Sequence, residues 1–202
     1  MKVSIVMASY LGHYRKAAMH RDKKIIRAID SVLAQTYKDI ELIIIADGCE
    51  KTVNIVKNSY LYNDKVKGYL IKKQKTWSGV PRNTGIDKAT GEWIIYLDID
   101  DYFLPTHVEK IVAQLKDSDK WVFFDDLVAT RSGKVKRRPC AMKMGKCGTS
   151  NVAHKKIAYW DEKGSYAHDW RFIKNLQSSG GKGRRILAGE YVVCHIPGRV
   201  DT

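Results

Sequence analysis

Three carboxylates stand within four positions at the end of an apolar run. Residues 93–97 read WIIYL, and Asp98, Asp100 and Asp101 follow directly. Like charges this close repel one another, and each is costly to remove from water unless it is paired or bound to a cation. Carboxylate oxygens suit Mg²⁺ or Mn²⁺, and two of them leave coordination positions free for a diphosphate. The spacing indicates a divalent-cation site, with a simple helix cap as the alternative for Asp101.

The elements that must position these acids alternate between strand-like and helix-like sequence. Runs rich in β-branched residues predict strands, and apolar residues three or four positions apart predict helices. Predicted strands cover residues 3–8, 41–46, 68–73, 92–97 and 121–126. Predicted helices lie within residues 25–33, 83–88, 105–115 and 165–176. This alternation predicts an α/β fold with a mainly parallel sheet, and the 202 residues are most simply one domain.

Several acids fall at the edge of this predicted sheet. Asp47 follows the second predicted strand, and the acidic cluster follows the fourth. In open parallel sheets, ligands bind at the carboxyl ends of the strands. We therefore expect these acids to face a ligand crevice rather than the core.

The positive charge is concentrated in one part of the chain. The formal net charge is +14, and residues 131–185 hold fifteen Lys or Arg against three acids. Such a field favours an anionic partner, such as a nucleotide, a nucleic acid or an acidic membrane surface, although a basic stretch can also be a solubilising surface. No apolar run approaches the length of a membrane span, no small-residue cleavage site follows the first residues, and the four cysteines lack CxxC spacing. A cytoplasmic protein with free thiols is expected.

Four ordered segments give the chain a more specific likeness. They are KVSIVMASY (2–10), RAIDSVLAQTYKDIELIIIADGC (27–49), RNTGIDKATGEWIIYLDIDDYF (82–103) and AHDWRF (167–172). In order and spacing they resemble the family 2 glycosyltransferases, which have the GT-A fold. The resemblance implies an inverting enzyme that moves a sugar from a nucleoside-diphosphate sugar, with a UDP-sugar favoured, to an acceptor hydroxyl with the help of Mn²⁺ or Mg²⁺.

The resemblance also implies which residues bind the donor nucleotide. These are Ala8, Ser9, Tyr10, Asp47, Arg82 and Asp98. The first three would wrap the base, and Asp47 would accept a hydrogen bond from a uracil ring. Arg82 would meet the base or the phosphates as a planar, charged donor. Asp98 would approach the ribose or a metal-bound water.

The remaining roles concern the metal and the acceptor. Asp100 would bind the metal directly, with Asp101 and His195 as further candidates, His195 also for phosphate. Asp169 would be the base that takes the proton from the acceptor hydroxyl. The family usually shows Glu-Asp at this point, whereas this chain has His168 before Asp169. Residues 1–105 would hold the nucleotide sugar, and residues 106–202 would hold the acceptor and the base.

The acceptor and the rival functions stay open at this level. A glycan, a lipid-linked sugar or a nucleic acid would each suit the family, and an anionic acceptor could be held by Lys134, Lys136, Arg137, Arg138, Lys182, Arg184 and Arg185. One alternative is a nucleotidyltransferase-like nucleotide-sugar enzyme, which would normally carry a glycine-rich phosphate loop. The other is a non-catalytic nucleic-acid-binding domain, which leaves the acids unexplained because carboxylates repel phosphate.

Overall fold

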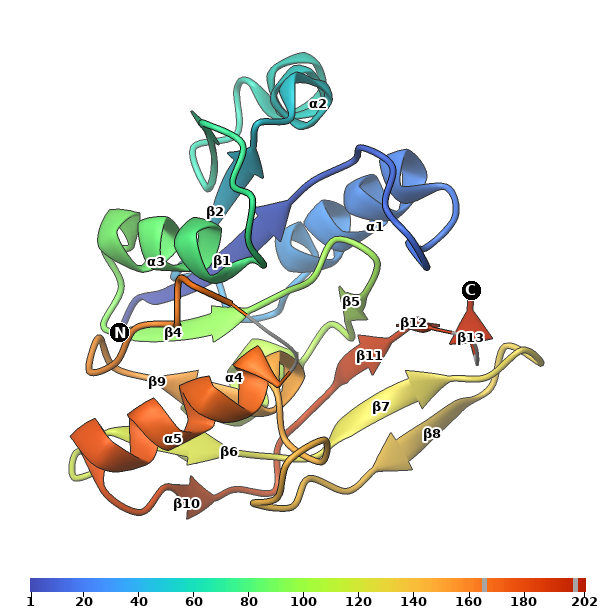
Figure 1. Cartoon of the computed structure of the whole chain (residues 1–202). Helices are drawn as coiled ribbons and strands as arrows, with labels where there is room; N and C mark the ends of the chain where they lie inside the picture. Colours follow the sequence, from blue (N-terminus) through green and yellow to red (C-terminus); the bar gives the residue numbers. More distant parts are fainter. Residues whose placement is uncertain (165–166, 198–199) are drawn as a thin grey trace.

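A seven-stranded sheet forms the centre of the computed structural model, which describes residues 1–164, 167–197 and 200–202 (Figure 1). Its order is β10-β6-β9-β4-β1-β2-β3. The strands are β1 (Val3–Ser9), β2 (Ile40–Asp47), β3 (Val66–Ile71), β4 (Trp93–Tyr96), β6 (Trp121–Phe123), β9 (Val152–His154) and β10 (Arg184–Arg185). Strands β4, β1, β2 and β3 are parallel, and β9 is antiparallel to β4 and β6. The predicted α/β class with a mainly parallel sheet is confirmed.

Helices cover both faces of this sheet. They are α1 (Arg21–Leu33), α2 (Glu50–Tyr60), α3 (Gly79–Lys88), α4 (His107–Val112) and α5 (His168–Gly180). Four of them were predicted, although Ser165 and Tyr166 of the last predicted helix lie outside the described residues. Helix α2 was not predicted. Its buried positions are Thr52, Val56 and Tyr60, and a stripe that includes a polar residue gives little periodic signal.

Alternation along the strands divides the core into two layers. On β1, Ile5 and Met7 pack with the apolar stripe of α1, and Val6 packs on the opposite face with residues of α3 and α5. Strands with helices on both faces read as continuous apolar runs, which is why β2 is buried at every position. All four cysteines are buried free thiols.

A second, smaller sheet lies beside the carboxyl end of β4. Its order is β5-β11-β7-β8, formed by β5 (Tyr102–Phe103), β11 (Tyr191–Val193), β7 (Asp126–Ala129) and β8 (Val135–Arg138). Strand β5 follows the acidic cluster directly and pairs antiparallel with β11. A short pair, β12 (His195–Ile196) with β13 (Val200–Asp201), continues from it. The last part of the chain is thereby brought against the turn that carries the acids.

Candidate functional site

The turn after β4 is held by residues almost a hundred positions away in the sequence. The hydroxyl of Tyr191 accepts a hydrogen bond from the amide of Asp98 (3.0 Å) and donates one to Oδ2 of Asp101 (2.8 Å). The amide of Cys194 donates to Oδ1 of Asp101 (2.7 Å). Asp101 is buried, and burial together with the charges of Asp100 and Asp98 raises its pKa well above the ordinary value. Both carboxylate oxygens of Asp101 thus already have protein donors.

Asp100 and His195 differ from Asp101. The charge of Asp100 is disfavoured where it lies, and one ring nitrogen of His195 has no hydrogen-bond partner. Removal from water and the charge of Asp98 raise the pKa of Asp100. Nε2 of His195 lies 3.0 Å from the carbonyl oxygen of Lys16 and donates to it, because a carbonyl oxygen can only accept. Nδ1 of the same ring is buried without a hydrogen-bond partner and lies 3.5 Å from Oδ1 of Asp201. Across the described part of the chain, no three His, Cys, Asp or Glu side chains gather closely enough to hold a metal by themselves.

A buried guanidinium connects this turn with the start of α5. Arg82, in the first turn of α3, is only 5% exposed, and its Nη2 donates to Oδ1 of Asp98 at 2.9 Å. Its Nη1 lies 3.2 Å from Nε2 of His168 and 3.7 Å from Oδ1 of Asp169. The guanidinium carbon lies 4.3 Å from the ring centroid of Trp160. Burial alone would lower the pKa of Arg82, but the two carboxylates outweigh it and the pKa is raised.

Asp169 lies in the first turn of α5 with 41% of its side chain exposed. The hydroxyl of Thr149 donates to its Oδ1 at 3.1 Å, and Nε2 of His168 lies 3.2 Å from the same oxygen. Burial lowers the pKa of His168 despite the neighbouring Asp169, so the ring is neutral near pH 7. No described residue donates a hydrogen bond to Oδ2. Among the described residues, Oδ1 of this carboxylate therefore has hydrogen-bonding and ion-pair partners, whereas Oδ2 accepts no hydrogen bond.

Lys73 lies between Asp47, the last residue of β2, and Tyr10, which follows β1. Asp47 is buried, with Oδ2 accepting from Nζ of Lys73 and Oδ1 from the amide of Gln74, both at 2.7 Å. Nζ of Lys73 also lies 4.2 Å from the ring centroid of Tyr10. Lys73 was not singled out from the sequence, because nothing in a run of lysines distinguishes the one that reaches an acid across the sheet edge.

The side chain of Ser9 differs from its neighbours. Its hydroxyl is buried and shares a 2.7 Å hydrogen bond with the hydroxyl of Thr52 in α2. Successive residues of a strand point to opposite faces, so Ser9 faces away when Ala8 and Tyr10 do not. The Ser9 hydroxyl is therefore engaged within the protein, and the contact of Ser9 with a nucleotide base stays a prediction.

Most of the basic residues expected to hold an anionic acceptor are already paired. Four of the seven form ion pairs with buried or nearly buried carboxylates at 2.5–2.7 Å: Arg137 with Asp125, Arg138 with Asp126, Arg184 with Asp119, and Arg185 with Asp125. These arginines neutralise acids that would otherwise be buried alone, which is costly. Much of the positive charge in this region is therefore paired with acids in and around the second sheet. Less of it remains for an anionic partner than the sequence indicated.

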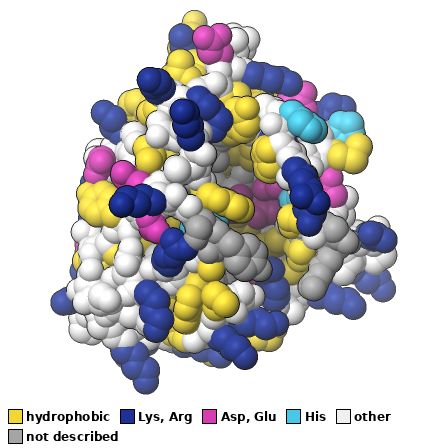
Figure 2. Space-filling model, in the orientation of Figure 1, with side chains coloured by type: hydrophobic (Ala, Val, Ile, Leu, Met, Phe, Trp, Pro, Cys, Tyr) yellow, Lys and Arg dark blue, Asp and Glu magenta, His cyan; other side chains and the backbone are white. Residues whose placement is uncertain are grey.

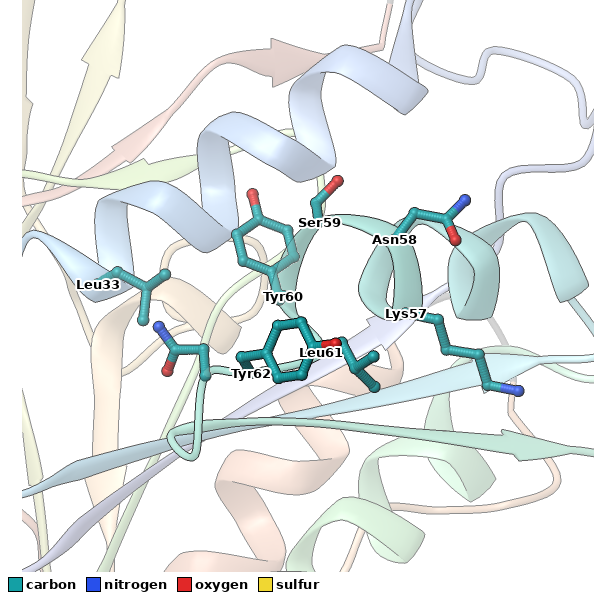
Figure 3. Close-up of a pocket in the computed structure, with 8 residues that line it drawn as sticks. Leu33, Lys57, Asn58, Ser59, Tyr60, Leu61 and Tyr62 are labelled. Carbon is teal, nitrogen blue, oxygen red and sulfur yellow. The ribbon is translucent and has the colours of Figure 1, made fainter.

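Two concave surfaces are visible. Figure 2 shows a hollow near the centre of one face, with acidic side chains inside it and basic ones around it. A separate pocket of about 480 Å³ is lined by Leu33 and residues 57–63 (Figure 3). It lies at the end of α2, beside the start of β3. The pocket is therefore near the amino ends of the parallel strands, whereas the acids follow their carboxyl ends. It contains no acid, histidine or cysteine, and we assign it no chemistry.

Two residues of the acidic site carried no signal in the sequence. Tyr191 sits in a strand-like run, and Trp160 stands in an irregular segment. Their roles depend on contacts with Asp101 and Arg82, which are 90 and 78 positions away. Local patterns cannot reveal partners at that separation.

Comparison with known proteins places this geometry in context. The family model described as Glycosyl transferase family 2 matches residues 17–176. The uncharacterized glycosyltransferase YwdF of Bacillus subtilis is 27% identical over 191 residues, which cover 94% of this chain and 60% of that protein. A poly(ribitol-phosphate) β-N-acetylglucosaminyltransferase, TarP of Staphylococcus aureus, is 32% identical over 58% of this chain and 34% of its own length. The chain thus spans between a third and three fifths of these relatives.

Solved structures show the same fold at low sequence identity. S. aureus TarS in complex with UDP superposes with a TM-score of 0.74 and 16% identity, covering 96% of this chain and 60% of that one. A Pyrobaculum calidifontis mannosyltransferase in complex with GDP-Man and Mn²⁺ superposes with a TM-score of 0.65 and 13% identity, covering 98% of this chain and 58% of that one. Among the helices that the structure describes, none is long and apolar enough to cross a membrane.

Proposed function

Because the chain belongs to glycosyl transferase family 2 and has the GT-A fold, we propose that it transfers a sugar from a nucleoside-diphosphate sugar to an acceptor hydroxyl. The observation that carries this proposal is the Arg82 bridge, in which one buried guanidinium reaches both Asp98 and Asp169. Such a bridge sets a donor-side acid and a candidate base at a defined separation, which is what a direct displacement needs.

We propose that the donor nucleotide lies between β1 and β2. Tyr10 offers a ring face to the base, beside Ala8, and Asp47 accepts a hydrogen bond from it. The Asp47 carboxylate has about four lone-pair directions, so it can accept from a uracil N–H in addition to its two protein donors. TarS is described with UDP and with UDP-GlcNAc, which favours a UDP-sugar over the GDP-sugar of the mannosyltransferase. Arg82 and Asp98 complete the donor side.

The residues present fit a divalent cation at Asp100 and His195. A histidine that donates one ring nitrogen to a carbonyl and keeps the other as a lone pair has the arrangement usual for a metal ligand. We propose that Asp100 and His195 would hold Mn²⁺ or Mg²⁺, and that Asp101, with both oxygens occupied, holds the turn instead. The cation would supply neutralisation of the departing diphosphate. The mannosyltransferase of the same fold is described in complex with Mn²⁺, which supports this assignment.

Asp169 would act as the base. Thr149 and Arg82 hold Oδ1, so Oδ2 is directed to take the proton from the acceptor hydroxyl. The neutral His168 accepts a hydrogen bond from Nη1 of Arg82, so its Nε2 carries no proton that could pass to Asp169. The activated oxygen attacks the anomeric carbon from the face opposite the leaving diphosphate, and one displacement inverts the configuration.

Residues 1–105 would form the donor half and residues 106–202 the acceptor half. The acceptor could be a glycan or a lipid-linked sugar; one relative is named for a sugar chain linked to undecaprenol through a diphosphate, and TarP is named for a poly(ribitol-phosphate) acceptor. The ion pairing of four basic residues argues against the alternative of a simple nucleic-acid-binding domain, because the paired carboxylates offset the positive charge that would attract phosphates.

Thermal shift with a panel of UDP-, GDP-, CDP- and dTDP-sugars, with and without Mn²⁺, tests the proposal. We expect one UDP-sugar to stabilise the protein in Mn²⁺, and Asp100→Ala to remove that stabilisation. Donor hydrolysis measured on the same samples should follow the same pattern. If none of the donors stabilises the protein, the proposal is contradicted.

A further inference from the structure

Trp77 is an indole left half in water beside the proposed base. It stands in the loop between β3 and α3, and 54% of its surface is exposed. Single exposed apolar residues are common on protein surfaces, so exposure alone assigns nothing. The position of this indole relative to Asp169 is what gives it meaning.

One side chain separates the indole from the carboxylate. The ring centroid of Trp77 lies 5.2 Å from that of His168, with the two planes inclined by 34°. Nε2 of His168 in turn lies 3.2 Å from Oδ1 of Asp169. A ligand ring that rests on the exposed part of the indole therefore has only His168 between that indole and the Asp169 carboxylate, whose Oδ2 accepts no hydrogen bond from the described residues.

The indole is also held from behind. Gly164, at φ +47°, packs so closely that a Cβ there would lie 3.0 Å from Cβ of Trp77 and 3.1 Å from its Cδ1. The same loop meets the first turn of α3, where a Cβ on Gly79 would lie 2.4 Å from the carbonyl oxygen of Asp161. A side chain fixed in this way offers a flat surface at little conformational cost on binding.

The groups around the indole favour a ligand that carries hydroxyls. The His168 ring that packs on the indole also contacts Asp169 and Arg82, and Arg82 pairs with Asp98. Carboxylates accept hydrogen bonds from hydroxyl groups. A pyranose has a face of C–H groups that packs on an aromatic ring and a rim of hydroxyls that can meet Asp169 and Arg82.

We propose that Trp77 is the platform on which a neutral sugar ring of the acceptor stacks, so that its hydroxyl reaches Oδ2 of Asp169. The inference rests on the proposed glycosyl transfer, and it names the acceptor class as a sugar. Trp77 determines which acceptor is held and how it is oriented, while Asp169 performs the proton transfer.

Saturation-transfer NMR with methyl glucoside, methyl galactoside and methyl N-acetylglucosaminide tests the platform without a donor. We expect at least one glycoside to bind the wild-type protein, Trp77→Ala to weaken that binding about tenfold or more, and Trp77→Phe to keep it within about threefold. Tyr62→Ala is the matched control, since Tyr62 is an aromatic residue 98% exposed in the pocket near the amino ends of the parallel strands. Binding of no glycoside, or equal binding by wild type and Trp77→Ala, overturns the inference.

A second measurement separates this inference from the proposed function. UDP-sugar binding in Mn²⁺ reports the donor site, and we expect Trp77→Ala to keep it within about threefold. The KM for the best glycoside acceptor should rise about tenfold in Trp77→Ala. A larger loss of UDP-sugar binding than of glycoside binding would make Trp77 a donor residue and overturn the inference alone. Glycoside binding through Trp77 without any donor binding would support the platform and contradict the transferase.

Discussion

The Nη2 atom of Arg82 lies 2.9 Å from Oδ1 of Asp98, which joins the first turn of α3 to the turn after β4. The pair is partly buried, and the other nitrogen of the guanidinium faces His168 and Asp169. A single planar cation thus lies between two acids that belong to different halves of the chain. Its shape matters as much as its charge, since a lysine ammonium cannot reach two carboxylates in this way.

Replacement of Arg82 tests this arrangement. We expect Arg82→Lys to lower turnover about tenfold and Arg82→Ala about a hundredfold, because the two acids then lose their common partner. The unfolding free energy should fall by about 1–3 kcal/mol in Arg82→Ala, the usual cost of leaving charged groups unpaired. Steady-state kinetics and urea unfolding measure the two effects. Arg184→Lys is the control, since Arg184 pairs with Asp119 away from the site.

Asp169→Asn tests the assignment of the base. The amide keeps the shape of the carboxylate but cannot take a proton, so transfer to the acceptor should fall about 10²–10⁴-fold. Binding of the UDP-sugar should remain, and calorimetry with the donor measures it. The matched substitution is Asp22→Asn, which removes an exposed carboxylate paired with Lys51. Near-normal transfer by Asp169→Asn would exclude it as the base.

Tyr191→Phe removes one hydroxyl that holds the acidic turn. The amide of Asp98 loses its acceptor, and Oδ2 of Asp101 loses its donor inside the protein. We expect the unfolding free energy to fall by about 1–3 kcal/mol and the Mn²⁺-dependent stabilisation by donor to weaken. Urea unfolding and thermal shift report these changes. Tyr62→Phe, at an exposed position, should change neither quantity. If Tyr191→Phe also leaves both the unfolding free energy and the donor stabilisation unchanged, Tyr191 does not hold the turn.

Two buried histidines predict a loss of stability in mild acid. Burial lowers the pKa of His107 to about 3 and that of His154 to about 4, against 6.5 for an exposed histidine. Below pH 6.5 these histidines bind protons in the unfolded chain but not in the folded chain. The free energy of unfolding therefore decreases as the pH falls. Each histidine contributes a slope of up to about 1.4 kcal/mol per pH unit.

Urea unfolding between pH 6.5 and 5 measures this slope, in a range where most carboxylates stay ionised in both states. His107→Gln, which does not titrate, should lower the slope by the contribution of one histidine, up to about 1.4 kcal/mol per pH unit. A slope that the substitution leaves intact would mean that these histidines are already protonated in the folded protein.

Most strands of the main sheet were predictable because each of them is a local pattern. Strands buried on both faces must be continuous apolar runs, and β1, β2 and β4 are such runs. The position of Asp47 and Asp98 at the carboxyl edge followed from the same rule. Helix α2 was missed because a polar threonine interrupts its buried stripe, and β10 was missed because two residues carry too little periodicity.

The sequence by itself therefore determined the α/β sheet, the edge at which the acids gather and the family likeness of four segments. Only the tertiary structure decided what each acid does: Asp101 is held by Tyr191, Asp98 and Asp169 share Arg82, and Asp125 and Asp126 neutralise arginines that looked free. The physical reason is that strand patterns arise from neighbours two to four positions apart. The charge, pKa and orientation of a side chain in the site depend on partners that only folding brings within about 3–4 Å.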